Sequence, residues 1–218
     1  MNQGEPGRGP DSPPTLKPTP AFIPPSLLLA FSELNAAPIL VGGAAVQVWT
    51  GRTDGLFQTE DLDFITHLQA SDFTRFPDFK REGRYIIVDG VAVEFPSGPL
   101  GVADVHLDAE KDTVVVPTST GGMVRCIRPE ALLLDRLAQV VGWNHADAYV
   151  QALAVLVMQG NTPGWDWAWL ESASKNSRLS TALGYLRREW ESGRPSPENL
   201  DEVLGLNWDS VKLRPPNG

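Results

Sequence analysis

The pattern of apolar and polar positions predicts a first half built from short strands and short helices. Residues 38–41 form a short apolar run, as a buried strand does. Residues 61–66 alternate polar with apolar side chains, which is typical of a strand that buries one face. Asp89-Gly90 separates two apolar runs and is a strong hairpin signal. By the same criteria we expect helices at 26–36, 44–50 and 71–76, and strands at 85–88, 91–95, 102–107, 114–116 and 123–127.

After Arg128 the spacing of apolar residues becomes helical, with helices expected at 131–141, 147–158, 165–173 and 179–190. A mixed first half followed by helices favours an α+β domain with a C-terminal helical lobe. We expect Ser26 to cap the first helix and Gly51 to end the second. The predicted layout is a disordered Pro-rich arm (1–25), an α/β core (26–128), a helical lobe (129–212) and a frayed tail (213–218).

Composition supports the predicted arm and narrows the classes of function. The 218 residues include 20 glycines and 19 prolines. Many of the prolines lie in residues 1–25, which therefore cannot form a helix interior or a central strand. No apolar run reaches about 18 residues, so no membrane span is expected. The net charge of −9 argues against a surface coated in basic charge for non-specific binding of nucleic acid.

Cysteine and histidine are too sparse for several kinds of site. Cys126 is the single cysteine, which excludes an internal disulfide or a multi-cysteine zinc site and suits a reducing cytoplasm. His67, His106 and His145 lie far apart, so a histidine-rich metal site is not expected. The sequence also lacks GxGxxG, GxxxxGK[ST], GxSxG and HExxH.

Acidic residues and a glycine pair form the candidate site. Asp61 and Asp63 lie two positions apart on a predicted strand and therefore project from one face. Two carboxylates this close repel each other unless one is protonated or a cation lies between them, and their hard oxygens suit Mg²⁺. Glu94 alternates with apolar neighbours on a later strand. Gly42-Gly43 precedes a predicted helix, whose free N–H groups favour phosphate.

These residues resemble a known family. The segments VGGAAVQVWTGR, TEDLDFIT and VAVEF are similar to motifs of the polymerase-β-type nucleotidyltransferase superfamily. Within it, the chain resembles the AbiEii-type, toxin-like bacterial nucleotidyltransferases and related uncharacterised proteins. In the helical context PEALLLDRLA, Arg136 stands where those proteins carry a Lys, and Asp147 stands at a later Asp. The resemblance covers roughly residues 36–158 and implies a mixed β-sheet core with flanking helices.

The resemblance also implies a reaction and a role for each motif residue. Asp61, Asp63 and Glu94 would hold one or two Mg²⁺ ions, and Glu94 would assist deprotonation of the acceptor hydroxyl. Gly42 and Gly43 would admit the triphosphate. The chain would move a nucleoside monophosphate from an NTP to a hydroxyl of RNA or protein, as a cytoplasmic, toxin-type enzyme with an antitoxin-like partner. Arg136 would be a further catalytic residue that neutralises phosphate charge in the transition state, with Arg52 assisting it. Arg52 and Asp147 would complete the nucleotide-binding residues.

Several alternatives stay open at this stage. The chain could be a catalytically inactive member of the fold that serves as a binding or regulatory module, because a fold does not fix a function. Arg136 could form a simple surface pair with Asp135, and Asp147 could only complement a helix dipole. Two further groups have structural or binding interpretations: the tryptophans 165, 167 and 169, which could pack in the core or grip a partner, and the basic residues 75, 80, 81 and 84, which could be a solvated turn or dock RNA.

Overall fold

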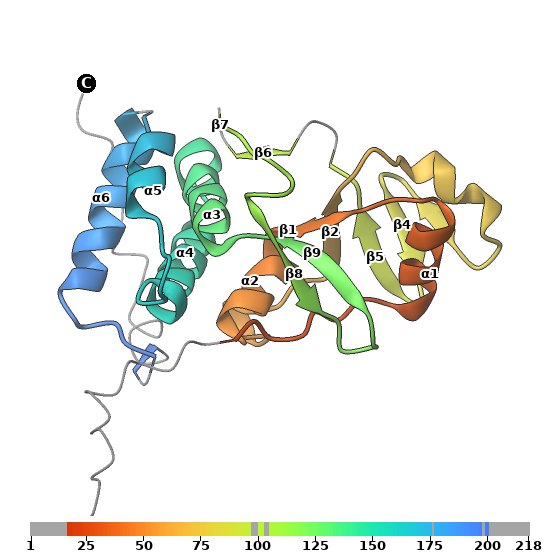
Figure 1. Cartoon of the computed structure of the whole chain (residues 1–218), viewed down its shortest axis with the longest axis horizontal. Helices are drawn as coiled ribbons and strands as arrows, with labels where there is room; N and C mark the ends of the chain where they lie inside the picture. The colour runs from red at the N-terminus through yellow and green to blue at the C-terminus, as the bar shows by residue number, and fades with distance from the viewer. Residues whose placement is uncertain (1–16, 97–99, 103–104, 176, 198, 201–218) are drawn as a thin grey trace, which may run out of the picture.

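The computed structural model describes residues 17–96, 100–102, 105–175, 177–197 and 199–200. It has an α+β fold with a mixed seven-stranded sheet, and the helical lobe lies at the opposite end of the long axis from α1 (Figure 1). The strand order is β3-β4-β5-β2-β1-β9-β8. The strands are β1 (Ile39–Val41), β2 (Asp61–Ile65), β3 (Lys80–Glu82), β4 (Tyr85–Val88), β5 (Val91–Glu94), β8 (Thr113–Pro117) and β9 (Met123–Ile127).

The elements confirm the predicted change after Arg128 from mixed strands and helices to helices. Those of the first half are α1 (Pro25–Glu33), α2 (Gly42–Thr50) and two 3-10 turns, η1 (Gly55–Phe57) and η2 (Ala70–Arg75). Those of the lobe are α3 (Pro129–Trp143), α4 (Ala146–Gln159), α5 (Trp167–Ala173) and α6 (Ser177–Glu191). Gly51 ends α2 in the left-handed conformation at φ 70°, as the sequence predicts.

Pairing in the centre of the sheet brings distant segments together. β1 is antiparallel to β2 and parallel to β9, while β2 is parallel to β5. The hairpin of β4 and β5 turns at Asp89 and Gly90, which have φ values of 52° and 82°. Such positive φ values at both central residues are what an Asp-Gly turn supplies. In the centre of the sheet, the pairing of β2 with β1 and β5 places Asp63 opposite Val41 on one side and opposite Glu94 on the other.

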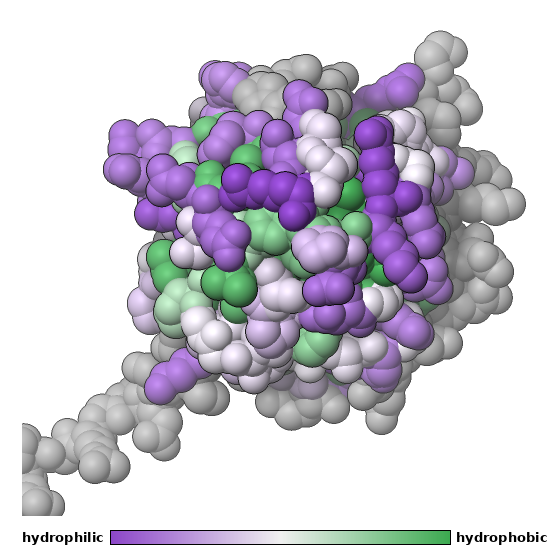
Figure 2. All heavy atoms as spheres, turned by 90° about the vertical axis from the view of Figure 1, so that its right-hand side faces the viewer, coloured by the Kyte–Doolittle hydropathy of each residue, from purple (hydrophilic) through white to green (hydrophobic). Residues whose placement is uncertain are grey.

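One face of the sheet is packed with aromatic side chains. Leu62 and Phe64 are buried there, in the alternation the sequence predicts for β2. Phe31 of α1 meets Phe64 edge-on with ring centroids 5.1 Å apart, and Phe73 of η2 stacks on Phe95 at 4.8 Å. Figure 2 views the molecule from the end at which α1 lies, where apolar side chains gather near the middle of the surface with hydrophilic ones around them. Because Phe31 of α1 and Phe73 of η2 pack on this face, the polar face of β2 is left for the site.

The lobe packs as a unit against α2. α3 packs on α4, α6 packs on both, and α2 lies against α4 and the sheet. Trp167 meets Trp165 and Trp190 with centroids 5.9 and 5.7 Å apart, and all three pack against the core. This supports the interpretation of the tryptophan run as packing. None of the helices in the described part of the chain combines the length and apolar character of a membrane span.

Several expectations need correction. Residues 17–25 are not an arm: Ala21 and Ile23 are buried, and Ala21 forms a parallel bridge with Thr118. The rest of the predicted arm and the predicted tail lie outside the described residues. Ser26 does not cap α1, because its hydroxyl donates to Asp89 Oδ2 at 2.6 Å and the helix begins at Pro25.

The prediction of a single strand at 102–107 is also wrong. The segment forms β6 (Gly101–Val102) and β7 (Val105–His106), which pair with each other in a separate two-stranded sheet. The helix expected at 71–76 is the tighter 3-10 turn η2. The basic segment after it contributes the exposed edge strand β3, which a run of charged residues did not suggest.

Candidate active site

Three carboxylates meet on the polar face of the sheet. Asp61 and Asp63 project from β2 and Glu94 from β5, and one oxygen of each lies within 4.8 Å of the others. We call these three residues the acid cluster. Their placement follows from the register: Asp63 is directly opposite Glu94, so the two side chains share a face, and Asp61 lies two residues earlier on that face. The structure thus brings together all three predicted metal ligands.

The carboxylates of the acid cluster repel one another. The pKa of Asp63 is raised to about 7, first because the carboxyl is buried and then because Asp61 and Glu94 add negative charge nearby. The charge of Arg136 acts in the opposite direction. Three hard carboxylate oxygens within 4.8 Å of one another match the donor set that Mg²⁺ or Mn²⁺ prefers. The residues therefore fit a divalent metal.

The glycine pair lies against the acid cluster. Gly42 has φ +66°, and a Cβ built on it would lie 2.1 Å from Asp63 Oδ2. A Cβ on Gly43 would lie 2.8 Å from Thr59 Oγ1. Both glycines begin α2, and among the described residues no side chain caps that N-terminus. The first N–H groups of α2 are thus presented beside the acid cluster, where they favour an anion.

Thr59 connects the glycines to the first aspartate. Its Oγ1 lies 3.1 Å from Asp61 Oδ1 and 3.1 Å from the Asp61 backbone oxygen. Since Thr59 also fills the space next to Gly43, the loop before β2 holds Asp61 against the start of α2. Thr59 was not predicted, although its position two residues before Asp61 was visible in the sequence.

Arg84 forms an ion pair with Glu94, the third carboxylate of the acid cluster. Its Nη2 is 3.3 Å from Glu94 Oε2 and donates to the Tyr85 hydroxyl at 2.6 Å. The guanidinium also lies over the Tyr85 ring, 4.9 Å from its centroid. Tyr85 pairs with Glu94 across the hairpin, which explains why its neighbour Arg84 reaches this carboxylate. The side chain of Arg84 is 68% exposed, so it can be displaced without unfolding the hairpin.

Arg136 approaches from the helical lobe. It is only 7% exposed, and its guanidinium forms an ion pair with Asp135 through Nε at 3.0 Å and through Nη2. Its Nη1 donates to Gln151 Oε1 at 3.4 Å. The predicted alternative, a surface pair with Asp135, is wrong in its location, because Arg136 is buried and its charge reaches Asp63.

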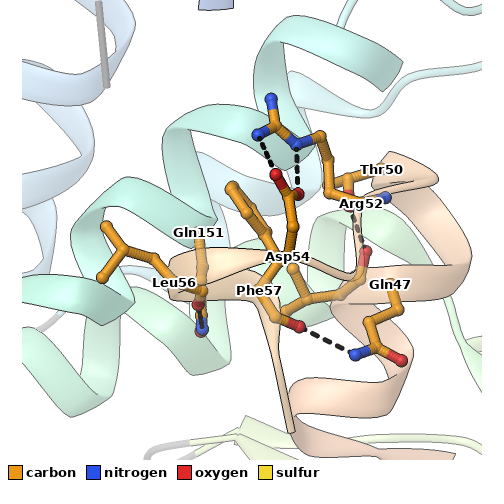
Figure 3. A network of polar contacts seen from close by, with 8 residues as sticks. Gln47, Thr50, Arg52, Asp54, Leu56, Phe57 and Gln151 are labelled. Carbon is orange, nitrogen blue, oxygen red and sulfur yellow. Dashed lines mark hydrogen bonds and ion pairs between the residues drawn. The ribbon is translucent and has the colours of Figure 1, made fainter. Parts of the chain in front are cut away.

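Arg52 and Asp147 lie outside the acid cluster. Arg52 pairs with Asp54 at 3.3 Å and lies over the Phe57 ring, in the loop between α2 and β2 (Figure 3). Asp147 is exposed in the first turn of α4, one turn before Gln151. Their roles in binding the nucleotide stay predictions.

Comparisons with known proteins give two similar solved structures. One is an antigenic nucleotidyltransferase-like protein from Paracoccidioides brasiliensis, 18% identical, with a TM-score of 0.43 over 74% of this chain and 85% of that one. The other is the antibiotic-resistance factor ANT(2'')-Ia, solved in solution, 14% identical, with a TM-score of 0.34 over 76% and 90%. No protein-family model and no curated protein matches the sequence. At such TM-scores the case for function rests on the site itself.

Proposed function

We propose that the chain is a divalent-metal-dependent nucleotidyltransferase that moves a nucleoside monophosphate from an NTP to an acceptor hydroxyl. The observation that carries the proposal is the position of the acid cluster beside the glycine turn at the start of α2. A metal site next to uncapped helix N–H groups pairs a cation with an anion-binding backbone, which a nucleoside triphosphate requires.

Asp61, Asp63 and Glu94 are the residues that would hold the metal. Bound there, the metal would supply Lewis-acid stabilisation of charge on phosphate oxygens. The uncapped start of α2 at Gly42 and Gly43 would bind the triphosphate through backbone N–H groups. Arg136, which is buried and whose charge acts on Asp63, would neutralise further phosphate charge.

The transfer itself needs a proton acceptor near the hydroxyl. The acceptor oxygen attacks the α-phosphorus and the bond to the bridging oxygen of the β-phosphate breaks, so that pyrophosphate leaves with the electron pair. The hydroxyl proton passes to the carboxylate of Glu94, on the side of the acid cluster where the exposed Arg84 approaches. We propose RNA or a protein as acceptor, and a cytoplasmic, toxin-type role with an antitoxin-like partner, on the strength of the sequence resemblance.

Ligand-dependent thermal unfolding tests the proposal. The wild type and Asp63→Asn are compared with each of the four NTPs, with and without Mg²⁺. A ligand at about 100 times its dissociation constant adds about 2.7 kcal/mol, and each kcal/mol moves the midpoint by roughly 2–4 °C for a chain of this size. We expect a Mg²⁺-dependent rise of several degrees in the wild type that Asp63→Asn abolishes. Asp78→Asn, the same change at an exposed position, is the matched control.

Transfer of label from [α-³²P]NTP to RNA or protein then separates enzyme from inactive module. Label transfer that depends on Asp63 and Glu94 supports catalysis. Nucleotide binding without transfer to any acceptor would favour the non-catalytic module. Absence of any metal-dependent nucleotide effect in the wild type would contradict the proposed function.

A further inference from the structure

The buried Arg136 is tied to the loop that leads into the acid cluster through one side chain of α4. Gln151 accepts from Arg136 Nη1 at 3.4 Å and donates from Nε2 to the Leu56 backbone oxygen at 2.8 Å. Leu56 belongs to η1, in the loop that continues through Thr59 to Asp61. Gln151 is therefore in contact both with the proposed phosphate-binding arginine and with the loop before a proposed metal ligand.

The chemistry of the two neighbours fixes the orientation of the Gln151 carboxamide. A guanidinium only donates hydrogen bonds, so it must face the oxygen of the carboxamide. A backbone carbonyl only accepts, so it must face the –NH₂ group. With Leu56 holding the –NH₂ group at 2.8 Å, the oxygen is directed at Arg136, and a flipped carboxamide would lose both bonds.

The remaining contacts of Arg136 do not hold it alone. Asp135 binds Nε and Nη2 through a single oxygen, Oδ2. Both bonds converge on one oxygen, so they position only the Nε–Nη2 edge of the guanidinium. Gln151 holds the third nitrogen, Nη1, from the neighbouring helix. Because a buried charge is costly unless its donors are satisfied, this contact also supports Arg136 in its buried position.

We propose that Gln151 is a positioning residue, which directs Arg136 toward the triphosphate and sets its place relative to the loop before β2. This inference rests on the proposed function, since it assigns Arg136 to phosphate. Gln151 need not touch the nucleotide: it acts through Arg136.

The chain offers a matched control in Gln47 of α2. Its Nε2 donates to the Phe57 backbone oxygen at 2.8 Å, so Gln47 and Gln151 fasten neighbouring carbonyls of the same loop (Figure 3). Both side chains are half-buried, but of the two only Gln151 is bonded to Arg136 in the described part of the chain. If Gln151 only fastens the loop, the two variants should behave alike.

The test measures the equilibrium dissociation constant of an NTP with Ca²⁺ as the metal, so that turnover does not enter. The variants are Gln151→Met, Gln47→Met, Arg136→Ala and the double variant Gln151→Met/Arg136→Ala. Methionine keeps side-chain length and removes the polar atoms, and unfolding midpoints verify that each variant folds. We expect Gln151→Met to weaken NTP binding roughly three- to tenfold and Gln47→Met to change it less than twofold. In the Arg136→Ala background, Gln151→Met should have no further effect.

The outcomes separate this inference from the proposed function. Equal effects of Gln151→Met and Gln47→Met, or additive effects of Gln151→Met and Arg136→Ala, would overturn the positioning role while leaving a metal–nucleotide site in place. Full NTP binding by Asp63→Asn would instead overturn the proposed function. A variant of Gln151 that fails to fold is replaced by Gln151→Glu, which keeps an oxygen toward Arg136 and loses the donor to Leu56. Its NTP affinity should then exceed that of the Arg136→Ala protein.

Discussion

The Asp63 carboxylate occupies the space that a side chain on Gly42 would need. A Cβ on Gly42 would lie 2.1 Å from Asp63 Oδ2, and the residue has φ +66°. The two are neighbours because Val41, the last residue of β1, pairs with Asp63 across the sheet. The glycine turn and β2, which carries Asp61 and Asp63, are therefore one structural unit, and a change in either one is expected to disturb the other.

Gly42→Ala should damage both stability and metal binding. The positive φ alone costs a side chain about 1–3 kcal/mol, and the clash forces Asp63 to move. We expect a lower unfolding midpoint and weaker binding of Mn²⁺, measured by calorimetry at pH 8. Gly142→Ala is the control, because it lies in the last turn of α3, where an added Cβ would have no neighbouring atom within 4 Å among the described residues. That variant should gain up to about 1 kcal/mol from its helical position. If Gly42→Ala bound Mn²⁺ as tightly as the wild type, the added Cβ would not displace the Asp63 carboxylate from its metal-binding position.

Asp63→Asn should stabilise the metal-free protein at pH 8. The folded-state pKa of Asp63 is about 7 against an ordinary 3.8, so between these values the unfolded chain loses the proton while the native state keeps it. Stability from this group is therefore present below about pH 4 and is lost as the pH rises to 7. At about 1.4 kcal/mol per pH unit the loss is a few kcal/mol, and asparagine avoids it.

Urea unfolding in EDTA at pH 8 and pH 4.5 measures this difference. The variant should exceed the wild type at pH 8, and the gap should shrink at pH 4.5. Addition of Mg²⁺ at pH 8 should raise the stability of the wild type alone. Equal stabilities of the two proteins at both pH values would mean that the native state does not disfavour the ionised form of Asp63.

Much of the acid cluster could be predicted from local patterns. The alternation of 61–66 predicts the shared face of Asp61 and Asp63, because a strand repeats every two residues. The Asp89-Gly90 turn also fixes Tyr85 opposite Glu94, so the contact of Arg84 with the cluster could have been found from the hairpin register. In contrast, the parallel pairing of β2 with β5 joins segments about thirty residues apart, and no local pattern specifies it.

The contacts of the helical lobe with the core were beyond local prediction. Gln151 reaches Leu56 across 95 residues, and Arg136 is buried because α3 packs on α4 beside the sheet. Helical spacing predicts which face of α3 is apolar, but it does not state what that face meets. Local patterns also did not predict that the segment 102–107 contributes to two short paired strands instead of one.

Arg84→Ala should tighten metal binding. Arg84 places a positive charge 3.3 Å from Glu94 Oε2, where it opposes a cation held by the acid cluster. The pair is exposed to solvent on the arginine side, so we expect only a roughly two- to fivefold lower dissociation constant for Mn²⁺. The gain should diminish at high salt, which screens exposed charges.

Arg81→Ala controls for the loss of one positive charge. Arg81 lies on β3 and pairs with Ile86, whose side chain is on the opposite face of the sheet from Tyr85. Its affinity for Mn²⁺ should stay close to that of the wild type. If both variants tighten binding equally, the effect is one of net charge, and the Arg84–Glu94 contact has no special part in it.

Cys126 should be unreactive in the native protein and can report on its unfolding. Its side chain is buried on the packed face of β9, where it pairs with Leu40 of β1, and burial raises the pKa of the thiol. Because the thiolate is the reactive species, both effects suppress attack on a disulfide reagent. We expect no labelling by DTNB at pH 8 in buffer, and one thiol labelled per chain in urea. The labelling rate at intermediate urea should follow the stability of the sheet, so Gly42→Ala should label faster than the wild type and Gly142→Ala no faster. Rapid labelling of the wild type in buffer would show that the sheet opens locally at β9, since no other cysteine exists in the sequence to react.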